Sequence, residues 1–387
     1  MHAASTASKN KGKRKMRNWL EVDLGKLEKN IETVKAVLPK DCQMIAVVKA
    51  NAYGHGEAKI CRALKLFGID KFAVASLGEA LYIREEGIDG DILVLSYVDP
   101  EDVPVAVDKN ITLAAISSDY VREAGRIAAA VGMNVKMHMK VNTGMNRVGF
   151  NCKTEDDLKA IAEAYSVPGT EFTGIFSHFS SSDDMSEGAD EYTKMQLLAF
   201  EKVLTYLEKR GIDPGLRHIS NSGAIGKYSE ARFDAVRCGA LMYGYNTAMD
   251  APMDVVPIGT WKAKISCIRT LEEGDAVSYS RHYIAKGGER IATLCVGYAD
   301  GYKRALSGKE DGPKGYVLIE GKKCPILGNI CMDQMMVDVS GTDAKAGDEA
   351  ILMGAGLTAD DLAEAAGTCM HDIISSIGPR VERIYVQ

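Results

Sequence analysis

The chain has 387 residues, a formal charge of −6, 46% hydrophobic and 26% charged residues, which is typical of a folded globular protein with one large core or two ordinary ones. No apolar run approaches the ~20 residues of a membrane-spanning helix, and the basic residues beyond the N-terminus alternate with acidic ones, which argues against nucleic-acid binding. Nine cysteines without zinc-ligand spacing or a secretory leader indicate free thiols, a reducing cytoplasmic compartment and no structural metal.

The first 17 residues are small and polar up to Ser8, and six cations follow within nine positions: Lys9, Lys11, Lys13, Arg14, Lys15 and Arg17. We expect residues 1–17 to form a disordered basic tail. A solvated tail and a linker cut from a longer membrane-anchored protein both fit, because cations collect near the cytoplasmic leaflet. Contact with a membrane is expected only in the second case.

Residues 18–250 alternate short β-rich runs with longer helical patterns, which indicates parallel strands joined by crossover helices. The predicted strands are 19–24, 43–50, 71–76, 91–96, 111–117, 134–141, 171–179 and 216–221, and predicted helices include 27–38, 57–67, 118–131 and 192–209. Eight such units predict an α/β fold of the TIM-type (β/α)8 barrel class, with its chemistry at the C-terminal strand ends. A doubly wound open sheet is the alternative, but no Gly-rich dinucleotide motif follows the first strand.

Residues 251–387 show a different pattern from residues 18–250: successive predicted strands are separated by Gly-containing turns. One helical stretch interrupts them near 358–366. This pattern predicts a second, β-rich C-terminal domain.

The segment MIAVVKANAYGHG, residues 44–56, carries the first chemical signal. An apolar strand ends there in Lys49, and burying an unpaired ammonium is costly and lowers its pKa. A desolvated amine of this kind can attach covalently to an aldehyde cofactor. A lysine that reaches solvent from an edge strand is the alternative.

The stretch AVVKANAYGHG resembles the cofactor-attachment motif of alanine racemases, and the resemblance extends from Trp19 to Tyr385. It implies pyridoxal 5′-phosphate on Lys49, a barrel followed by a β domain, and a small amino acid as substrate. It also implies a homodimer in which the β domain of one chain covers the barrel of the other, so that active sites are shared between subunits.

Further motifs extend the resemblance to the cofactor site. VNTGMNRVGF is similar to the family's DTGMxRxG, which implies that Arg147 orients cofactor and substrate, although Asn142 replaces the usual aspartate. Lys140 corresponds to a lysine that is sometimes carbamylated in the family. SHFSSSD implies a role for His178 after the seventh predicted strand. ISNSG and VRCGALMYG imply a phosphate-binding cup completed by Tyr53, its other members being Asn221, Ser222 and Gly239.

The same comparison places Arg237 against the pyridine nitrogen of the cofactor. A guanidinium donates a hydrogen bond but does not deprotonate, so it keeps that nitrogen unprotonated and weakens the cofactor as an electron sink. Transamination is thereby disfavoured, and return of the proton to Cα becomes the main outcome.

The β-rich domain carries the remaining motifs. AVSYSRHY resembles the family's VSYGxxY, which implies that Tyr279 is the second catalytic base and reaches the lysine of the partner subunit. ICMDQ matches a segment that lines the substrate pocket, here Cys331, Met332 and Asp333. GYADGY, residues 297–302, is expected to serve as a turn and at an interface.

One departure concerns the substrate. Where the family has a tyrosine that touches cofactor phosphate and substrate side chain, GTCMHDI places His371. A smaller polar ring there leaves room for a hydroxymethyl group. The serine racemases of vancomycin-resistant bacteria, which are tethered to the membrane, also depart from alanine racemases at this position.

The predicted function is two-base, pyridoxal-phosphate-dependent interconversion of L- and D-alanine, which supplies D-amino acid for cell-wall peptidoglycan. Racemisation of serine, or of both serine and alanine, is the first alternative. An amino-acid decarboxylase is the second, although such enzymes normally pair the pyridine nitrogen with an acid and this chain offers Arg237.

Overall fold

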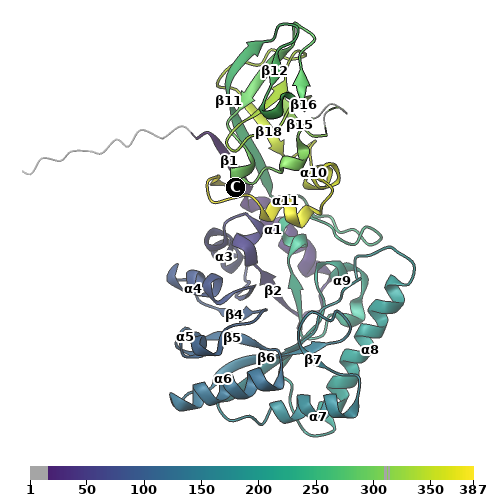
Figure 1. Ribbon diagram of the computed structural model, residues 1–387. Helices are drawn as coiled ribbons and strands as arrows, with labels where there is room; N and C mark the ends of the chain where they lie inside the picture. The colour runs from purple at the N-terminus through teal and green to yellow at the C-terminus, as the bar shows by residue number, and fades with distance from the viewer. Residues whose placement is uncertain (1–15, 309–311, 313) are drawn as a thin grey trace, which may run out of the picture. The chain divides into compact units, whose positions relative to one another are not determined.

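The computed structural model describes residues 16–308, 312 and 314–387. The chain divides into two compact units (Figure 1). The barrel unit comprises residues 22–258 and 385–387, and the β unit comprises residues up to Glu21 and from Gly259 to Ile384. The predicted boundary at residue 250 thus lies eight residues before the division at Ile258. The chain also crosses from the β unit to the barrel unit after Glu21 and again after Ile384.

The barrel unit is built on eight parallel strands, in the order β5-β4-β3-β2-β10-β9-β8-β6, and a further pairing of β5 with β6 closes the ring. The strands are β2 (Gln43–Val47), β3 (Lys71–Val74), β4 (Asp91–Val94), β5 (Ile111–Ala115), β6 (Val135–Asn142), β8 (Thr170–Phe176), β9 (Leu216–His218) and β10 (Ala235–Cys238). A two-residue strand, β7 (Phe150–Asn151), adds to β6. The predicted TIM-type barrel is confirmed.

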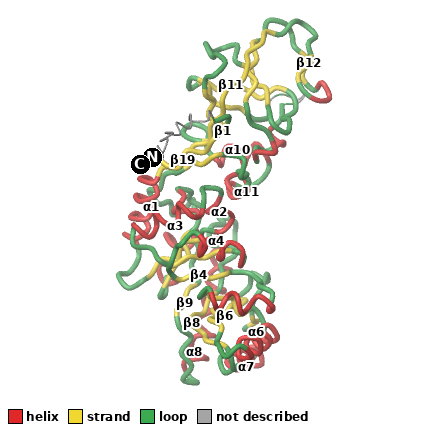
Figure 2. The backbone as a smooth tube through the Cα atoms, turned by 90° about the vertical axis from the view of Figure 1, so that its left-hand side faces the viewer, coloured by secondary structure: helices red, strands yellow, loops and turns green. Residues whose placement is uncertain are grey.

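Helices lie outside these strands (Figure 2). They are α1 (Leu24–Val37), α3 (Glu57–Leu66), α4 (Leu77–Glu85), α5 (Val103–Asp108), α6 (Ser118–Ala130), α7 (Glu155–Ala164), α8 (Ala189–Glu208) and α9 (Ser222–Lys227). Side-chain oxygens begin many of them, as when Ser76 and Glu79 form a capping box at α4. The four helices predicted from periodicity match α1, α3, α6 and α8 to within three residues.

The prediction of the first barrel strand is wrong. The run at 19–24 is a strand, β1 (Asn18–Asp23), but it pairs in the sheet of the β unit between β11 and β19. The eighth barrel strand is instead β10, which hydrogen-bonds to β2 and β9. An alternating apolar pattern predicts a strand without saying which sheet it joins, and β10 is only four residues long and contains a charged residue.

This correction shifts the numbering of the barrel by one strand. His178 follows β8, the sixth barrel strand, and not the seventh. Asn221 and Ser222 follow the seventh strand and Gly239 follows the eighth. The loops after strands seven and eight are where TIM barrels commonly bind phosphate, so the corrected order strengthens the predicted phosphate cup.

The β unit centres on a closed ring of antiparallel strands, in which β11 pairs with both β18 and β14. Its strands are β11 (Gly259–Thr270), β14 (Arg290–Leu294), β15 (Tyr316–Ile319), β16 (Lys322–Leu327), β17 (Met335–Asp338) and β18 (Glu349–Met353), with β1 and β19 (Glu382–Val386) at one edge. β12 (Ala276–Val277) and β13 (Tyr283–Ile284) form a separate hairpin. The predicted helix corresponds to α10 (Ala359–Ala366), and α11 (Met370–Ser375) follows it.

Most of the predicted basic tail lies outside the described residues: Lys9, Lys11, Lys13, Arg14 and Lys15. Arg17 does not belong to such a tail, because its guanidinium bonds both oxygens of the Asp300 carboxylate at 2.5 and 2.6 Å. Within the described ranges, no helix combines the length and apolar character needed to cross a bilayer.

Candidate active site

The predicted cofactor lysine lies just beyond the end of β2, not on the strand itself. Lys49 begins a short turn, α2 (Lys49–Tyr53), and the next four residues all have φ between 52° and 54°: Ala50, Asn51, Ala52 and Tyr53. Each L-residue held in this left-handed region costs about 1–2 kcal/mol, so surrounding contacts must hold the turn. Strain of this kind is concentrated at functional sites, which singles out this turn.

Burial lowers the pKa of the Lys49 ammonium, and the positive charges of Arg147 and Arg237 lower it further. Glu79 acts in the opposite direction and partly offsets Arg147. The lowered pKa increases the fraction of neutral amine, which is the form that attacks an aldehyde and accepts a proton.

Arg237 is the most firmly held charge in the barrel. It projects from β10, is 3% exposed, and its NH2 group donates to the carbonyls of Ser177 at 2.7 Å and Ile219 at 2.9 Å. NH1 and NH2 also donate to Nδ1 of His218 at 2.9 Å and of His178 at 3.0 Å. Burial lowers the pKa of Arg237 to about 9, which leaves it charged at neutral pH. Its Nε–H makes no hydrogen bond with any described residue.

The histidines beside Arg237 are neutral, because burial and the Arg237 charge lower the pKa of both His178 and His218 well below the usual value. Arginine has no acceptor, so each Nδ1 accepts and each Nε2 carries the proton. His218 then donates to Nδ1 of His138 at 2.9 Å. Neither His138 nor His218 was predicted from the sequence, although the alternation in MHMK, residues 137–140, places His138 and Lys140 on one face of β6.

Lys140 lies in the same interior layer. It is 4% exposed, its Nζ donates to the carbonyl of Val141 at 3.2 Å, and burial with the nearby Arg237 and Arg147 lowers its pKa well below the usual value. Arg147 itself is on an exposed loop, which Asn142 holds by accepting the N–H of Asn146 at 2.9 Å. Asn142 therefore supports this loop although it replaces the family's aspartate.

Tyr53, Ser222 and Gly239 come together at one corner of the barrel mouth. The Oγ of Ser222 accepts the N–H of Gly239 at 3.0 Å, and a Cβ at Gly239 would lie 2.7 Å from the Tyr53 hydroxyl. Asn221 caps α9 by accepting the N–H of Ala224 at 3.1 Å. Burial raises the pKa of Tyr53 to about 12, so its hydroxyl stays a neutral donor. The structure thus brings the four predicted phosphate-cup residues to adjoining loops.

Tyr279 lies in the β unit, in a turn between β12 and β13. Its side chain is 70% exposed, and its main-chain carbonyl accepts the side-chain amide of Asn329 at 2.8 Å. The preceding Ser278 hydroxyl contacts Cys331 Sγ at 3.4 Å. The turn of the predicted base therefore contacts the predicted substrate-lining segment 331–333.

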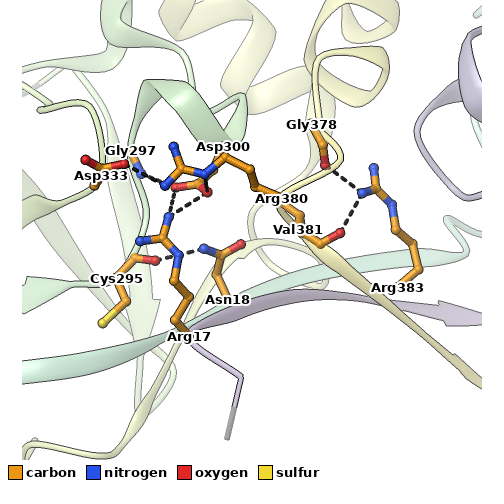
Figure 3. A network of polar contacts seen from close by, with 10 residues as sticks. All are labelled: Arg17, Asn18, Cys295, Gly297, Asp300, Asp333, Gly378, Arg380, Val381 and Arg383. Atoms are coloured by element: carbon orange, nitrogen blue, oxygen red, sulfur yellow. Dashed lines mark hydrogen bonds and ion pairs between the residues drawn. The ribbon is translucent and has the colours of Figure 1, made fainter. Parts of the chain in front are cut away.

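Asp333 is held by a network of buried and half-buried charges (Figure 3). Arg380 donates to Asp333 at 2.6 Å and also lies 3.5 Å from Asp300, whose side chain is completely buried. Asp300 accepts the N–H of Gly297 at 2.9 Å.

The GYADGY turn contacts the segment 331–333 through its backbone. The N–H groups of Tyr298 and Ala299 donate to the carbonyls of Cys331 and Met332 at 3.1 and 3.0 Å.

His371 is on α11 of the β unit, where its carbonyl accepts the Ser375 hydroxyl at 2.6 Å. The helix is joined to the turn after GYADGY by Lys303, which pairs with Asp372 at 2.9 Å. Met332, the remaining predicted substrate residue, is 53% exposed.

The turn at Tyr279 contains a strained residue that offers a stability test. Ser280 has φ 63°, and the alanine racemase motif has glycine at this place. We expect Ser280→Gly to stabilise the protein by about 1 kcal/mol, because glycine adopts this conformation without the steric cost of Cβ. Thermal unfolding measures the effect. Ser266→Gly, in strand β11, is the control and should destabilise; a lowered midpoint for Ser280→Gly would contradict the prediction.

Glu57, behind the lysine turn, gives a pH-dependence. Its Oε2 is buried without a hydrogen-bond partner among the described residues, and burial together with Glu79 raises its pKa from 4.5 to about 7. Because the folded protein binds this proton more tightly than the unfolded chain, stability is full below pH 4.5 and declines as the pH rises through about 7.

We therefore expect Glu57→Gln to flatten the dependence of unfolding free energy on pH between 4.5 and 7. Urea denaturation at pH 5 and pH 8 measures the difference. Glu230→Gln, at an exposed position, is the control and should follow the unmodified chain. Parallel pH profiles for all three proteins would contradict the prediction.

Most of the chain matches two known protein domains. Residues 22–247 match the alanine racemase N-terminal domain, and residues 258–385 match the alanine racemase C-terminal domain. The chain belongs to the alanine racemase family.

Individual members of the family agree with this assignment. The chain is 39% identical over 376 residues to alanine racemase 2 of Caldanaerobacter subterraneus subsp. tengcongensis, covering 95% of this chain and 94% of that one. The structure of alanine racemase from Clostridium difficile 630 matches with a TM-score of 0.90 and 33% identity, over 97% of each chain. Alanine racemase from Bartonella henselae, with covalently bound pyridoxal phosphate, matches with a TM-score of 0.84 and 27% identity, over 96% of this chain and 100% of that one.

Alanine racemases use pyridoxal 5′-phosphate, and the residues of this barrel fit that group. The positive charges of Arg147 and Arg237 act on both Lys49 and Lys140, and this positive potential suits an anionic phosphate ester. Gly239 leaves space that a Cβ would fill beside the Tyr53 hydroxyl. The unpaired Nε–H of Arg237 is a donor for a ring nitrogen.

Proposed function

We propose that this alanine racemase family member interconverts L- and D-alanine, with pyridoxal 5′-phosphate on Lys49 and with Lys49 and Tyr279 as the two catalytic bases. The observation that carries the proposal is Arg237, a buried side chain that is charged at neutral pH and fixed by five hydrogen bonds inside the barrel. Its place beside a lysine of lowered pKa suits a racemase better than the alternative decarboxylase, which normally offers an acid to the cofactor ring.

The bound cofactor supplies an electron sink that acidifies the Cα proton of an amino acid attached to it. Racemisation then needs proton-transfer groups on both faces of Cα. The Tyr279 phenol serves one face and removes the proton of L-alanine. The Lys49 amine serves the other face and returns a proton, and the two groups exchange duties for D-alanine. Arg147 orients the reacting groups by its charge.

Arg237 directs this proton back to Cα. Its guanidinium donates a hydrogen bond without giving up a proton, so the ring nitrogen is not protonated by it. With the cofactor bound, Arg237 would thereby weaken its electron withdrawal and favour return of the proton to Cα over transfer to another atom. The neutral His178 and His218 support Arg237, because both accept its N–H groups and neither carries a positive charge that would repel the guanidinium.

We further infer a homodimer in which the partner subunit supplies Tyr279 to each Lys49. Its support is the exposure of Tyr279 and of its neighbours in the β unit, since Tyr298 and Met332 are 42% and 53% exposed. Exposed aromatic and apolar side chains near a proposed catalytic group are typical of an interface. A cytoplasmic location is supported by nine cysteines that are all free thiols.

Alanine is the proposed substrate because the relatives described above are alanine racemases. Serine stays an alternative that rests on His371 in place of the family tyrosine. Catalytic efficiency on L-alanine and L-serine separates the two, and negligible turnover of serine removes the alternative.

The test of the proposed function is solvent deuterium exchange at Cα of L-alanine, followed together with optical rotation and release of carbon dioxide. A racemase incorporates deuterium and abolishes the rotation without releasing carbon dioxide. Release of carbon dioxide would identify a decarboxylase, and an unchanged amino acid would overturn the proposal.

A further inference from the structure

In the left-handed turn after β2, the main-chain N–H of Ala50 donates a hydrogen bond to a side chain outside the turn. The N–H groups of Ala52 and Gly54 donate to the carbonyls of Val48 and Ala50 at 2.8 and 3.0 Å. The N–H of Ala50, the residue next to Lys49, instead donates to Oε1 of Glu79 at 2.6 Å. Glu79 lies 29 residues later, in the first turn of α4.

The second oxygen of the same carboxylate binds the end of the neighbouring strand. Oε2 of Glu79 accepts the N–H of Ala75 at 2.7 Å and the N–H of Ser76 at 3.2 Å. Ala75 follows β3, which pairs directly with β2 in the barrel. One carboxylate thus joins the turn that carries Lys49 to the end of the adjacent strand.

Helix capping alone does not require glutamate at this place. In α7 and α10 an aspartate does the equivalent work: Asp157 accepts the N–H groups of Lys153 and Thr154 at 3.0 and 2.9 Å, and Asp361 accepts the N–H of Thr358 at 2.7 Å. The additional methylene of Glu79 gives its carboxylate the reach to accept the N–H of Ala50 as well. A carboxylate is also needed, because its two oxygens accept from three N–H groups and an amide has only one acceptor oxygen.

Glu79 also contributes charge at the lysine. It opposes the effect of Arg147 and Arg237 on the pKa of Lys49. The same side chain therefore restrains the backbone beside Lys49 and moderates its electrostatic surroundings.

We propose that Glu79 is a positioning residue for the racemase reaction: by binding the N–H of Ala50 it holds the left-handed turn that presents Lys49 and Tyr53 to the cofactor. The inference rests on the proposed function for its consequence in catalysis. Its structural part, the restraint of residues 50–56, stands on the hydrogen bonds alone.

The experiment compares the full-length protein with Glu79→Asp and Ser76→Ala, each with bound cofactor and after its removal. Glu79→Asp keeps a capping carboxylate at α4 but is too short to reach Ala50. Ser76→Ala is the matched control: it removes the hydroxyl that accepts the Glu79 N–H at 3.3 Å and leaves the bond to Ala50 intact. Hydrogen exchange resolved along the chain, the rate of pyridoxal phosphate release and kcat are measured for each.

For Glu79→Asp we expect exchange within residues 50–56 and cofactor release to rise about ten- to hundredfold, the effect of losing one hydrogen bond to a charged group. Exchange within α4 should stay close to that of the unmodified protein. For Ser76→Ala we expect faster exchange only at the start of α4. Conversion of L-alanine should slow for Glu79→Asp through kcat and not for Ser76→Ala.

Two results overturn the proposal: unchanged exchange at residues 50–56 in Glu79→Asp, or exchange raised equally throughout the barrel unit, which identifies Glu79 as a general stabilising residue. Failure of the proposed function gives a different result. In that case the unmodified protein does not convert alanine, while Glu79→Asp still loosens residues 50–56.

Discussion

Replacement of Lys49 by alanine is expected to abolish racemisation, with a loss of at least about 10⁴-fold, because the variant lacks both the amine that attaches the cofactor and one of the two bases. The visible absorbance of the lysine-bound cofactor should disappear with it. The loss is not a folding effect, since Lys49 lies beyond β2 and its side chain makes no described hydrogen bond or ion pair.

Absorbance spectra and racemase assays of Lys49→Ala measure both losses. Lys71→Ala is the control, because Lys71 begins the adjacent strand at the opposite end of the barrel and pairs with Asp91. Its spectrum and activity should match those of the unmodified protein. An unchanged spectrum in Lys49→Ala would refute the cofactor assignment.

Replacement of Tyr279 by phenylalanine removes one face of the reaction. Racemisation should fall by about 10²–10⁴-fold, the usual contribution of a positioned acid or base. Exchange of the Cα proton with deuterium should persist for D-alanine, which Lys49 serves, and should be lost for L-alanine. Tyr316→Phe, in β15 of the same unit, is the control and should retain both exchanges. Equal loss of exchange for both enantiomers would contradict the two-base assignment.

A mixture of Lys49→Ala and Tyr279→Phe subunits tests where the second base comes from. If active sites are shared in a two-fold dimer, each mixed dimer contains one intact site, and subunit exchange should restore about a quarter of the original activity. Restored activity requires Tyr279 from the partner subunit. Lack of recovery after demonstrated subunit exchange would place both groups in one chain.

The fold class was predictable because periodicity separates helices from strands and their alternation identifies a parallel barrel. The membership of each strand was not predictable in the same way. β1 is a short apolar run of about the length of a barrel strand, whereas β10 offers four residues with Arg237 among them. Pairing depends on contacts between distant segments, so β1 was assigned to the wrong sheet.

In the candidate site, too, residues within local motifs were predictable, whereas residues that act through contacts between distant segments were not. Motifs in the sequence predict that Tyr53, Ser222 and Gly239 lie together, and the structure brings these three residues to one corner of the barrel mouth. The residues that support the site were less visible: Glu79 has the spacing of an ordinary capping box, and its bond to Ala50 depends on the left-handed turn. His138 left a signal in the alternation of β6, but its partner His218 is on β9, and β8 separates these two strands in the sheet, so the sequence does not reveal the histidine pair.

The strand β1 has a consequence for synthesis on the ribosome. It emerges about 240 residues before its partner β11, and its other partner β19 follows later still. The barrel between them is continuous from Val22 to Ile258 and can assemble while β1 waits unpaired. The β unit can therefore be completed only after β19 has been synthesised, when the barrel strands have long been available to pair.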